Sequence, residues 1–451
     1  EIDGQVNGTL AKRSPGSALK PFTYALALDQ GLVHPMSLLK DTPMSFGAFD
    51  PENFDKGFEG PIHVREALTS SRNVPAVFLA SRLKELSLFD FLKTAGVALP
   101  KTEKHYGLAL TLGGAEVTME ELAGLYAGLA NKGAFKPLRH FRDAEIPEGK
   151  RLMSPEAAFL TLDMLRTNAR NNEKHLDSWA RDSVPVAWKT GTSYGFRDAW
   201  TAGVVGNYVI VVWLGNFEGQ SNPALIGRDL AAPLFFQIAD GLRREGDKEP
   251  SWLDTRELNL KKVEVCSLSG HLPGDHCKHR AKTWFIPAKS PIAKCEIHRE
   301  IRIAANGMRA CDDSRRDVVK HVFEFWPSDL LQLFRQAGIP RRSPPAYEPG
   351  CRTSEATTGL APQITSPRQA VSYSLRVDGE REPASREGVP LAATADADVR
   401  TLHWFVGNEY VGESSPQKTI MWKPRPGRHV VRVLDDLGRS DSRSLEVEIT
   451  R

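Results

Sequence analysis

Apolar residues recur with helical spacing through the first half of the chain. From about residue 10 to residue 245, apolar stretches alternate with short Gly- and Pro-containing segments, which is typical of a helix-rich region. One such run, Pro21 to Gln30, ends at Gly31, where a helix C-cap is expected. Further on, Ala199 to Val205 and Tyr208 to Leu214 are predicted to pair as strands around a two-residue turn. This region is therefore predicted to be an α+β domain.

Polar segments divide the remainder of the chain. The stretch Arg243 to Pro250 has no apolar face, and the stretch from Arg341 to Gly359 is rich in residues that interrupt helices and strands. Both are predicted linkers, which gives three parts: residues 1–245, 246–358 and 359–451. The middle part is predicted to be a small module holding all the cysteines and one helix, Ser328 to Ala337. The last part is predicted to be an all-β, immunoglobulin-like sandwich, with strands at Ser372–Val377, Leu402–Val406, His429–Leu434 and Leu445–Ile449.

Composition and charge exclude several classes of protein. Of 451 residues, 41% are hydrophobic and 25% are charged, as in ordinary globular proteins. The formal net charge of +3 provides no broad basic surface, so a nucleic acid is not an expected partner. No stretch approaches the roughly 18 apolar residues of a membrane span. The chain begins Glu1-Ile2-Asp3 rather than with Met, and we expect it to be part of a longer protein.

The spacing of Ser17 and Lys20 predicts a nucleophile and its base. Ser17 precedes the helical run by a few residues, so both side chains share the face of its first turn. The partial positive charge of a helix N-terminus favours a serine alkoxide and a neutral lysine. By itself this motif is weak, because Ser-x-x-Lys also occurs at Ser37/Lys40, Ser81/Lys84 and Ser415/Lys418.

Two further motifs follow Ser17-x-x-Lys20 in a fixed order. They are Ser71-Arg72-Asn73 and Lys189-Thr190-Gly191, and each occurs once in the chain. Together the three motifs resemble the Ser-x-x-Lys, Ser-Asp-Asn and Lys-Thr-Gly set of the serine penicillin-recognising enzymes. The chain departs from this set at Arg72, where aspartate is usual.

The surrounding residues narrow the resemblance to the transpeptidase domain of class A penicillin-binding proteins. The segments Arg13–Phe22, Glu66–Ala76 and Leu112–Gly114, followed by Glu120–Leu122, are similar to that family. The start of the middle module, Cys266–Gly270, and the terminal sandwich resemble the C-terminal part of one branch of the family. In these proteins a membrane anchor and a glycosyltransferase domain precede the transpeptidase. We therefore expect the glycosyltransferase part to be absent from this chain and the transpeptidase domain to be truncated at its N-terminus.

The resemblance implies a catalytic role for four residues. Ser17 is expected to be the acylated nucleophile, and Lys20 the base that removes its proton. Ser71 is expected to relay that proton to the leaving amine. Lys189 is expected to lie on the strand at the edge of the cleft, where its charge supports Ser71 and attracts a substrate carboxylate.

Four more residues are expected to bind the substrate. Asn73 is implied as a hydrogen-bonding partner of the donor peptide amide, and Thr190 and Thr192 as hydroxyl donors. Gly191 lets the substrate approach the strand closely, and the backbone N–H groups of Ser17 and Thr192 would form the oxyanion hole. The flanking aromatic residues are predicted to be core residues and not part of the site: Trp188, Tyr194, Phe196 and Trp200.

The five cysteines, at 266, 277, 295, 311 and 351, allow two hypotheses. A possible set of metal ligands lies among Cys266, Cys277, Cys295 and His298. The paired Cys-x-x-Cys spacing of common zinc sites is absent, however. Since the resemblance implies an extracytoplasmic protein, disulfides are the expected state: Cys266–Cys277 and Cys311–Cys351, with Cys295 left over. We therefore expect no metal and no cofactor.

The leading functional hypothesis is a DD-transpeptidase on the periplasmic side of the bacterial inner membrane. Peptidoglycan peptide stems and β-lactam antibiotics are the expected partners, and the C-terminal sandwich is a candidate for docking other cell-wall or envelope proteins. One alternative is hydrolysis of the same acyl-enzyme, as in a carboxypeptidase or β-lactamase. The other is a non-catalytic module that binds penicillin or peptidoglycan. A Ser-His-Asp triad is disfavoured, because no histidine has a partner acid at a suitable spacing.

Overall fold

The computed structural model describes most of the chain. The described residues are 6–47, 49–168, 185–242, 250–311, 317–351, 359–368, 372–376 and 388–450. They belong to two compact units, of which one is Glu1–Leu272 with His279–Ala293 and the other is Pro273–Lys278 with Lys294–Arg451. Most of the predicted linker at Arg243 to Pro250 lies outside the described residues. The division into three parts therefore stays a prediction.

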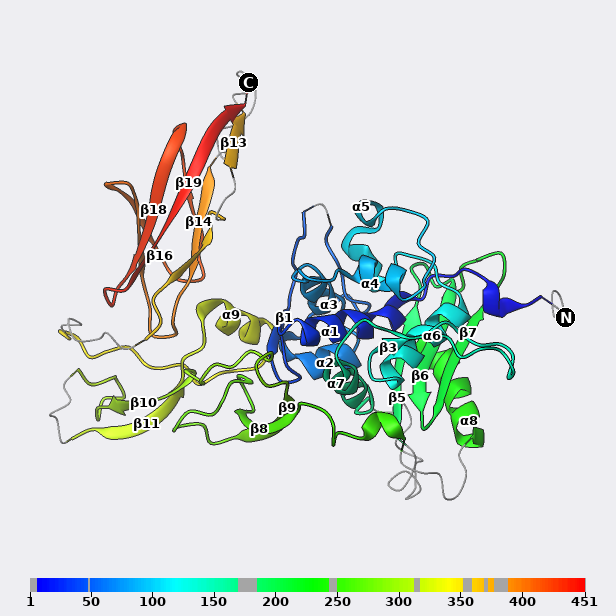
Figure 1. Cartoon of the computed structure of the whole chain (residues 1–451). Coiled ribbons are helices and arrows are strands. Elements are labelled where there is room, and N and C mark those ends of the chain that lie inside the picture. Colours follow the sequence, from blue (N-terminus) through cyan, green and yellow to red (C-terminus); the bar gives the residue numbers. More distant parts are fainter. Residues whose placement is uncertain are drawn as a thin grey trace. The chain divides into compact units, whose positions relative to one another are not determined.

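Helix α1 (Lys20–Asp29) is the central element of the first unit. Every residue from Lys20 to Leu28 is buried, which is possible only for a helix surrounded by protein. Pro21 lies in its first turn, where a missing N–H does no harm. As Figure 1 shows, α1 is flanked by other helices: α2 (Val64–Thr69), α3 (Asn73–Ala80), α4 (Leu88–Thr94) and α7 (Pro155–Leu165). The predicted helix is thus confirmed.

An antiparallel sheet with the order β5-β6-β7 lies beside these helices (Figure 1). Its strands are β5 (Val186–Thr192), β6 (Asp198–Val205) and β7 (Tyr208–Gly215). Val205 pairs with Tyr208, so the predicted hairpin closes with the expected two-residue turn. Helix α8 (Ala232–Leu242) packs its buried Phe235 against one face of the sheet, and α6 (Met119–Ala130) packs on the other face. The sheet is therefore the middle layer of three.

The first unit also contains shorter elements around this framework. Strand β1 (Leu38–Asp41) pairs with strand β2 (Gly60–His63). The long connection between them, residues 42–59, reaches toward the N-terminus of α3. The remaining elements are α5 (Glu103–Tyr106), β3 (Ala134–Phe135), β4 (Lys150–Arg151), β8 (Lys261–Cys266) and β9 (Arg280–Phe285).

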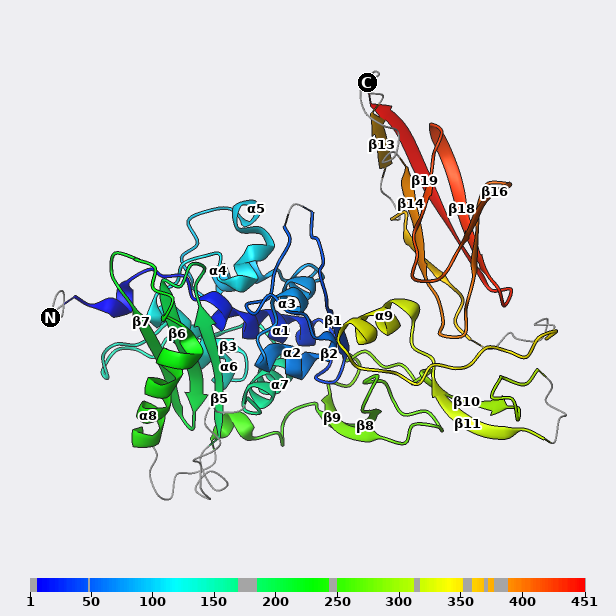
Figure 2. The same cartoon turned by 180° about the vertical axis from the view of Figure 1, so that it is seen from behind.

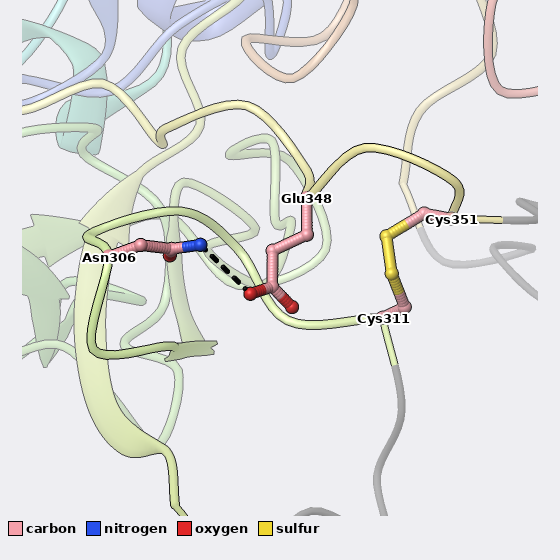
Figure 3. Close-up of a disulfide and its surroundings, with 4 residues drawn as sticks. All are labelled: Asn306, Cys311, Glu348 and Cys351. Carbon is pink, nitrogen blue, oxygen red and sulfur yellow. Dashed lines mark hydrogen bonds between the residues drawn. A yellow bond between two sulfur atoms is a disulfide. The ribbon is translucent and has the colours of Figure 1, made fainter.

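The second unit contains the disulfide drawn in Figure 3. Cys311 is joined to Cys351, as predicted, and Asn306 Nδ2 donates a hydrogen bond to Glu348 Oε1 across the same two segments at 3.0 Å. The elements here are β10 (His298–Ile303), β11 (Val319–Glu324) and α9 (Ser328–Gln336), the last in agreement with the predicted helix.

The predicted Cys266–Cys277 disulfide is wrong. The structure has no disulfide at Cys266, Cys277 or Cys295. The sulfur of Cys277 lies instead 3.4 Å from Nδ1 of His298 and accepts a hydrogen bond from the backbone N–H of Gly274 at 3.3 Å. The thiol of Cys277 is thus engaged by a histidine and a backbone donor rather than by a second sulfur.

The C-terminal part is an all-strand sandwich, seen from opposite sides in Figures 1 and 2. One sheet has the order β13-β19-β18-β15-β16 and the other has the order β12-β14-β17. Their inner faces share one core around Trp404, Leu391 and Val431. The strands are β12 (Gln363–Ser366), β13 (Ser372–Arg376), β14 (Val389–Thr394), β15 (Leu402–Val406), β16 (Glu409–Ser414), β17 (Ile420–Trp422), β18 (Gly427–Asp435) and β19 (Ser440–Thr450).

In the described part of the chain, no helix is both long enough and apolar enough to cross a membrane.

Candidate active site

Ser17 lies in the tight turn Gly16–Leu19, which leads directly into α1. Its side chain is partly exposed, whereas Lys20, at the start of α1, is fully buried. A hydroxyl at the surface with an amine buried behind it is the arrangement that the Ser-x-x-Lys motif predicts.

Hydrogen bonds from three directions fix the segment that carries Ser17. Ser14 Oγ donates to the carbonyl of Gly113 at 2.7 Å, and the indole N–H of Trp200 donates to the carbonyl of Ser14 at 2.8 Å. On the other side of Ser17, the buried hydroxyl of Tyr126 donates to the carbonyl of Ala18 at 3.0 Å. The position of the nucleophile is therefore set by the sheet and by α6 together.

Glycines allow β5 to pack directly against this turn. Gly16 has a φ of +53°, and a Cβ at this position would overlap the backbone of Thr192. A Cβ at Gly191 would overlap the carbonyl oxygen of Pro15, and one at Gly113 would overlap the backbone of Gly16. Only glycine fits such close backbone contacts. They place the turn that carries Ser17 directly against the backbone of Thr192.

Ser71 lies between the two buried lysines. Lys189 Nζ donates to Ser71 Oγ at 2.8 Å and to the carbonyl of Thr190 at 3.0 Å. Lys20 Nζ donates to the carbonyl of Ser71 at 2.5 Å and to Asn73 Oδ1 at 2.6 Å, and it lies 3.4 Å from Ser71 Oγ. The backbone of Ser71 has a φ of +63°, a strained conformation for a residue with a side chain.

The structure thus brings together residues from three distant motifs. Among the described residues, however, no hydrogen bond joins Lys20 Nζ to Ser17 Oγ, although the motif predicts that the two groups are neighbours. The amine is held instead by the carbonyl of Ser71 and the amide oxygen of Asn73. In unliganded sites, such catalytic contacts are often long and shorten only when a substrate binds.

The two lysines differ from ordinary surface lysines in their acidity. Burial lowers the pKa of Lys20 well below its ordinary value, and the charges of Lys189 and Arg72 lower it further. Burial also lowers the pKa of Lys189, to about 7, and the nearby charge of Arg228 contributes to this. Two ammonium groups cannot both remain charged at low energy in a buried site, so Lys20 is suited to be the neutral base.

Arg72, the departure from the Ser-Asp-Asn pattern, acts as a structural anchor. Its guanidinium is buried and binds Asp41 Oδ2, at the end of β1, at 2.7 Å. It also binds two acceptors of the β1–β2 connection: Asp55 Oδ2 at 2.8 Å and the carbonyl of Gly57 at 2.5 Å. Asn53, in the same connection, accepts a hydrogen bond from the backbone N–H of Asn73 at 2.7 Å. Arg72 therefore fixes the segment that holds Ser71 and Asn73.

The predicted substrate-binding residues line the same region. Thr190 and Thr192 are partly exposed on β5, and Gly191 between them is buried. Thr192 Oγ1 accepts a hydrogen bond from the backbone N–H of Gly227 at 3.0 Å. Asn73 Nδ2 donates to the carbonyl of Glu52 at 2.5 Å, so its amide faces both Lys20 and the β1–β2 connection.

The other Ser-x-x-Lys matches have local structural roles. Ser37 Oγ accepts a hydrogen bond from the backbone N–H of His34 at 2.9 Å. Ser81 Oγ donates to the carbonyl of Phe78 at 2.7 Å. In the second unit, Ser415 starts a turn in which its carbonyl accepts a hydrogen bond from Lys418. These contacts agree with the expectation that most of the matches are not catalytic.

The expectation that all four flanking aromatic residues are core residues is wrong for Tyr194. Trp188 and Trp200 are buried, but Tyr194 is 99% exposed. Phe196 is only partly buried, and its ring contacts that of the exposed Phe54 with the centroids 5.8 Å apart. The reason is local: β5 ends at Thr192, so the next residues form a surface turn instead of continuing the strand.

Comparison with known proteins identifies the family to which the chain is similar. Residues 5–228 match the family model of the penicillin binding protein transpeptidase domain. Residues 351–449 match the penicillin-binding protein C-terminus family, and residues 256–300 match the C-terminal domain of penicillin-binding protein 1A. The chain belongs to the penicillin-binding proteins with a transpeptidase domain.

Individual relatives extend this result along nearly the whole chain. Penicillin-binding protein 1C of Escherichia coli is 33% identical over 97% of this chain and 56% of its own length. Penicillin-binding protein 1F of Bacillus subtilis is 31% identical over 57% of this chain and 37% of its own length. The chain thus spans only part of the length of these curated relatives, from 37% to 56%. A crystal structure of penicillin-binding protein 1A from Haemophilus influenzae has the same fold over 64% of this chain and 50% of its own, with a TM-score of 0.54 and 22% identity.

Replacing Arg72 tests its role as an anchor. In Arg72→Ala, the buried carboxylate of Asp41 loses its ionic partner, and the β1–β2 connection loses the guanidinium that links it to the Ser71–Asn73 segment. Since a displacement of about 1 Å can lower a rate roughly 10²-fold, we expect acylation by a penicillin to slow by about that factor. Stopped-flow measurement of the second-order acylation rate checks this.

Two variants accompany the Arg72 experiment. Arg72→Lys keeps the charge without the forked hydrogen bonds and should show an intermediate rate. Arg82→Ala, at an exposed arginine beyond the end of α3, is the matched control and should leave the rate unchanged. Wild-type acylation by a folded Arg72→Ala protein would contradict the anchor role.

The pH dependence of acylation tests the influence of Arg228 on Lys189. Protonated Lys189 predominates below its pKa of about 7, so its contribution to acylation should decline as the pH rises through that value. Arg228→Gln removes a positive charge, which raises the pKa of Lys189, and the alkaline decline should move to higher pH. Arg228→Lys should leave it in place. Identical pH profiles for wild type and Arg228→Gln would contradict this coupling.

Proposed function

We propose that the chain carries the serine DD-transpeptidase activity of peptidoglycan synthesis. Ser17 is the nucleophile that a D-Ala-D-Ala peptide stem acylates, with release of the terminal D-Ala. The acyl group then passes to an amine of a neighbouring stem. The observation that carries this proposal is the convergence of Lys20 and Lys189 on Ser71, immediately behind the turn that holds Ser17.

The hydrogen bonds of Lys20 support its role as the base. A neutral amine has two N–H groups and one lone pair. The two N–H groups have acceptors at short distance, the carbonyl of Ser71 and Oδ1 of Asn73. The lone pair therefore remains free for a hydroxyl proton. It accepts the proton of Ser17 as Ser17 Oγ attacks the substrate carbonyl.

The proton reaches the leaving amine through Ser71. Ser71 Oγ lies 3.4 Å from Lys20 Nζ, and it accepts a hydrogen bond from Lys189. The proton of the Ser71 hydroxyl is therefore directed away from Lys189 and can pass to the departing D-Ala nitrogen. Lys20 then donates to Ser71 Oγ the proton that it took from Ser17. The bond between the stem carbonyl and D-Ala breaks, and the ester to Ser17 remains.

Lys189 and β5 bind the substrate in this proposal. Protonated Lys189 has three N–H groups, and two of them are directed to Ser71 and Thr190. The third can bind the terminal carboxylate of a peptide stem or the carboxylate of a penicillin, with the hydroxyls of Thr190 and Thr192 alongside. The backbone N–H groups of Ser17 and Thr192 form the oxyanion hole.

The proposal extends to partners and location. Peptide stems and β-lactams are the ligands of the Ser17 site, which lies on the periplasmic side of the inner membrane, where peptidoglycan is assembled. The C-terminal sandwich is the part proposed to dock other cell-wall or envelope proteins. On this sandwich Tyr410 is half exposed, whereas Trp422 is buried.

Covalent labelling tests the nucleophile. Wild type and Ser37→Ala should react with a fluorescent penicillin, whereas Ser17→Ala should not, because Ser17 Oγ is the group proposed to form the acyl-enzyme. Peptide mass mapping should locate the adduct on the peptide that contains Ser17. Absence of labelling in folded wild-type protein would overturn the catalytic proposal and favour a non-catalytic binding module.

The products then separate transfer from hydrolysis. Incubation with stems that carry both a D-Ala-D-Ala donor and a free acceptor amine should yield crosslinked dimers. Exclusive formation of the monomer shortened by one D-Ala would identify a carboxypeptidase instead.

A further inference from the structure

Three potential metal ligands meet in the second unit, which does not contain the Ser17 site. They are the sulfurs of Cys277 and Cys295 and the Nδ1 atom of His298, all within 4.8 Å of one another. Nδ1 of His298 lies 3.4 Å from the sulfur of Cys277 and 3.6 Å from the sulfur of Cys295. Both cysteines are 5% exposed, and His298, the first residue of β10, is partly buried.

These separations are those of a tetrahedral zinc site. With a Zn–S bond of about 2.3 Å and a Zn–N bond of about 2.0 Å, tetrahedral angles put a sulfur and a nitrogen about 3.6 Å apart. Both measured sulfur–nitrogen distances lie within about 0.2 Å of that value. The arrangement therefore has the spacing of zinc ligands before any atom is moved.

A hydrogen-bonded cluster explains the same geometry less well. A ring nitrogen carries at most one hydrogen, so His298 Nδ1 can direct a straight hydrogen bond to only one of the two sulfurs. The two sulfurs nevertheless lie at nearly equal distances from it. A metal ion placed between the three atoms accounts for both distances at once.

The local backbone supports a thiolate at Cys277. The N–H of Gly274 donates to the sulfur of Cys277 at 3.3 Å, a contact that stabilises negative charge on a ligand sulfur. Gly274 also packs closely on the segment of Cys295, because a Cβ at this position would lie 2.9 Å from the carbonyl oxygen of Cys295. Glycine thus lets the two cysteine-bearing segments approach each other.

We propose that Cys277, Cys295 and His298 bind a structural zinc ion. The two thiols lose their protons to the solvent on binding, and His298 coordinates through Nδ1 in its neutral form. Structural zinc has four ligands, so one further ligand completes the set. This proposal replaces the expectation of a disulfide and of no metal in this segment.

Zinc content measured on the whole chain tests the proposal. The chain is expressed with zinc, dialysed and assayed by inductively coupled plasma mass spectrometry, and we expect about one zinc per chain. Cys295→Ser and His298→Ala should reduce this to below about one tenth. His298→Cys, which restores a zinc ligand, should retain the metal, and His279→Ala, at an exposed histidine nearby in the sequence, should leave the content unchanged.

Thiol counting provides a second readout that does not depend on the variants. Of the five cysteines, two form the Cys311–Cys351 disulfide, so removal of zinc with a chelator should make three thiols available for alkylation. One alkylated thiol in the non-reduced protein would reveal a second disulfide and overturn the proposal. A wild-type chain without zinc after dialysis, or zinc retained equally in every variant, would also overturn it.

Discussion

Two lysine amines, buried on either side of one serine, define the chemistry of this site. In a medium that solvates charge poorly, two adjacent ammonium groups repel each other strongly, and each also loses the stabilisation that water provides. Lys20, with no exposed surface and with the charges of Lys189 and Arg72 nearby, is driven toward its neutral form. Lys189 titrates near neutrality. The fold thus lowers the pKa of both lysines, most clearly that of the fully buried Lys20.

The rest of the first unit holds these groups at fixed positions. Lys20 begins a helix that is buried on all sides, and Lys189 belongs to a strand covered on both faces. Glycines at 16, 113 and 191 remove the side chains that would otherwise separate the nucleophile turn from β5. Arg72 fixes Ser71 from the opposite side through Asp41 and Asp55. Stability and site geometry therefore depend on the same packing.

The sequence predicted the parts of the structure that depend on local spacing. The helix after Ser17, the β6–β7 hairpin, α9 and several sandwich strands follow from periodicity and turn residues within a few positions of one another. The three motifs were recognisable because their residue types are fixed by chemistry. That they meet around Ser71 is a property of the tertiary fold, which no spacing along the chain encodes.

The features that the sequence did not predict depend on tertiary partners or on the exact end of a strand. In the sequence Arg72 is only a departure from a motif, because its acceptors, Asp41 at the end of β1 and Asp55 on the β1–β2 connection, lie on segments with no signal of their own. Tyr194 is predicted to be a core residue because the sequence does not show where β5 ends. Cys277 was paired with Cys266, whereas its sulfur lies beside His298.

The most direct test of this view of the site is the protonation state of Lys20. In protein labelled with 13C at the lysine ε-carbons, the Lys20 signal is identified by its loss in Lys20→Arg and is followed by NMR as the pH is raised. The structure predicts that Lys20 titrates well below the ordinary lysine value of 10.5 and is neutral when the site is active. A Lys20 signal that titrates at or above that value would contradict the role of Lys20 as the base.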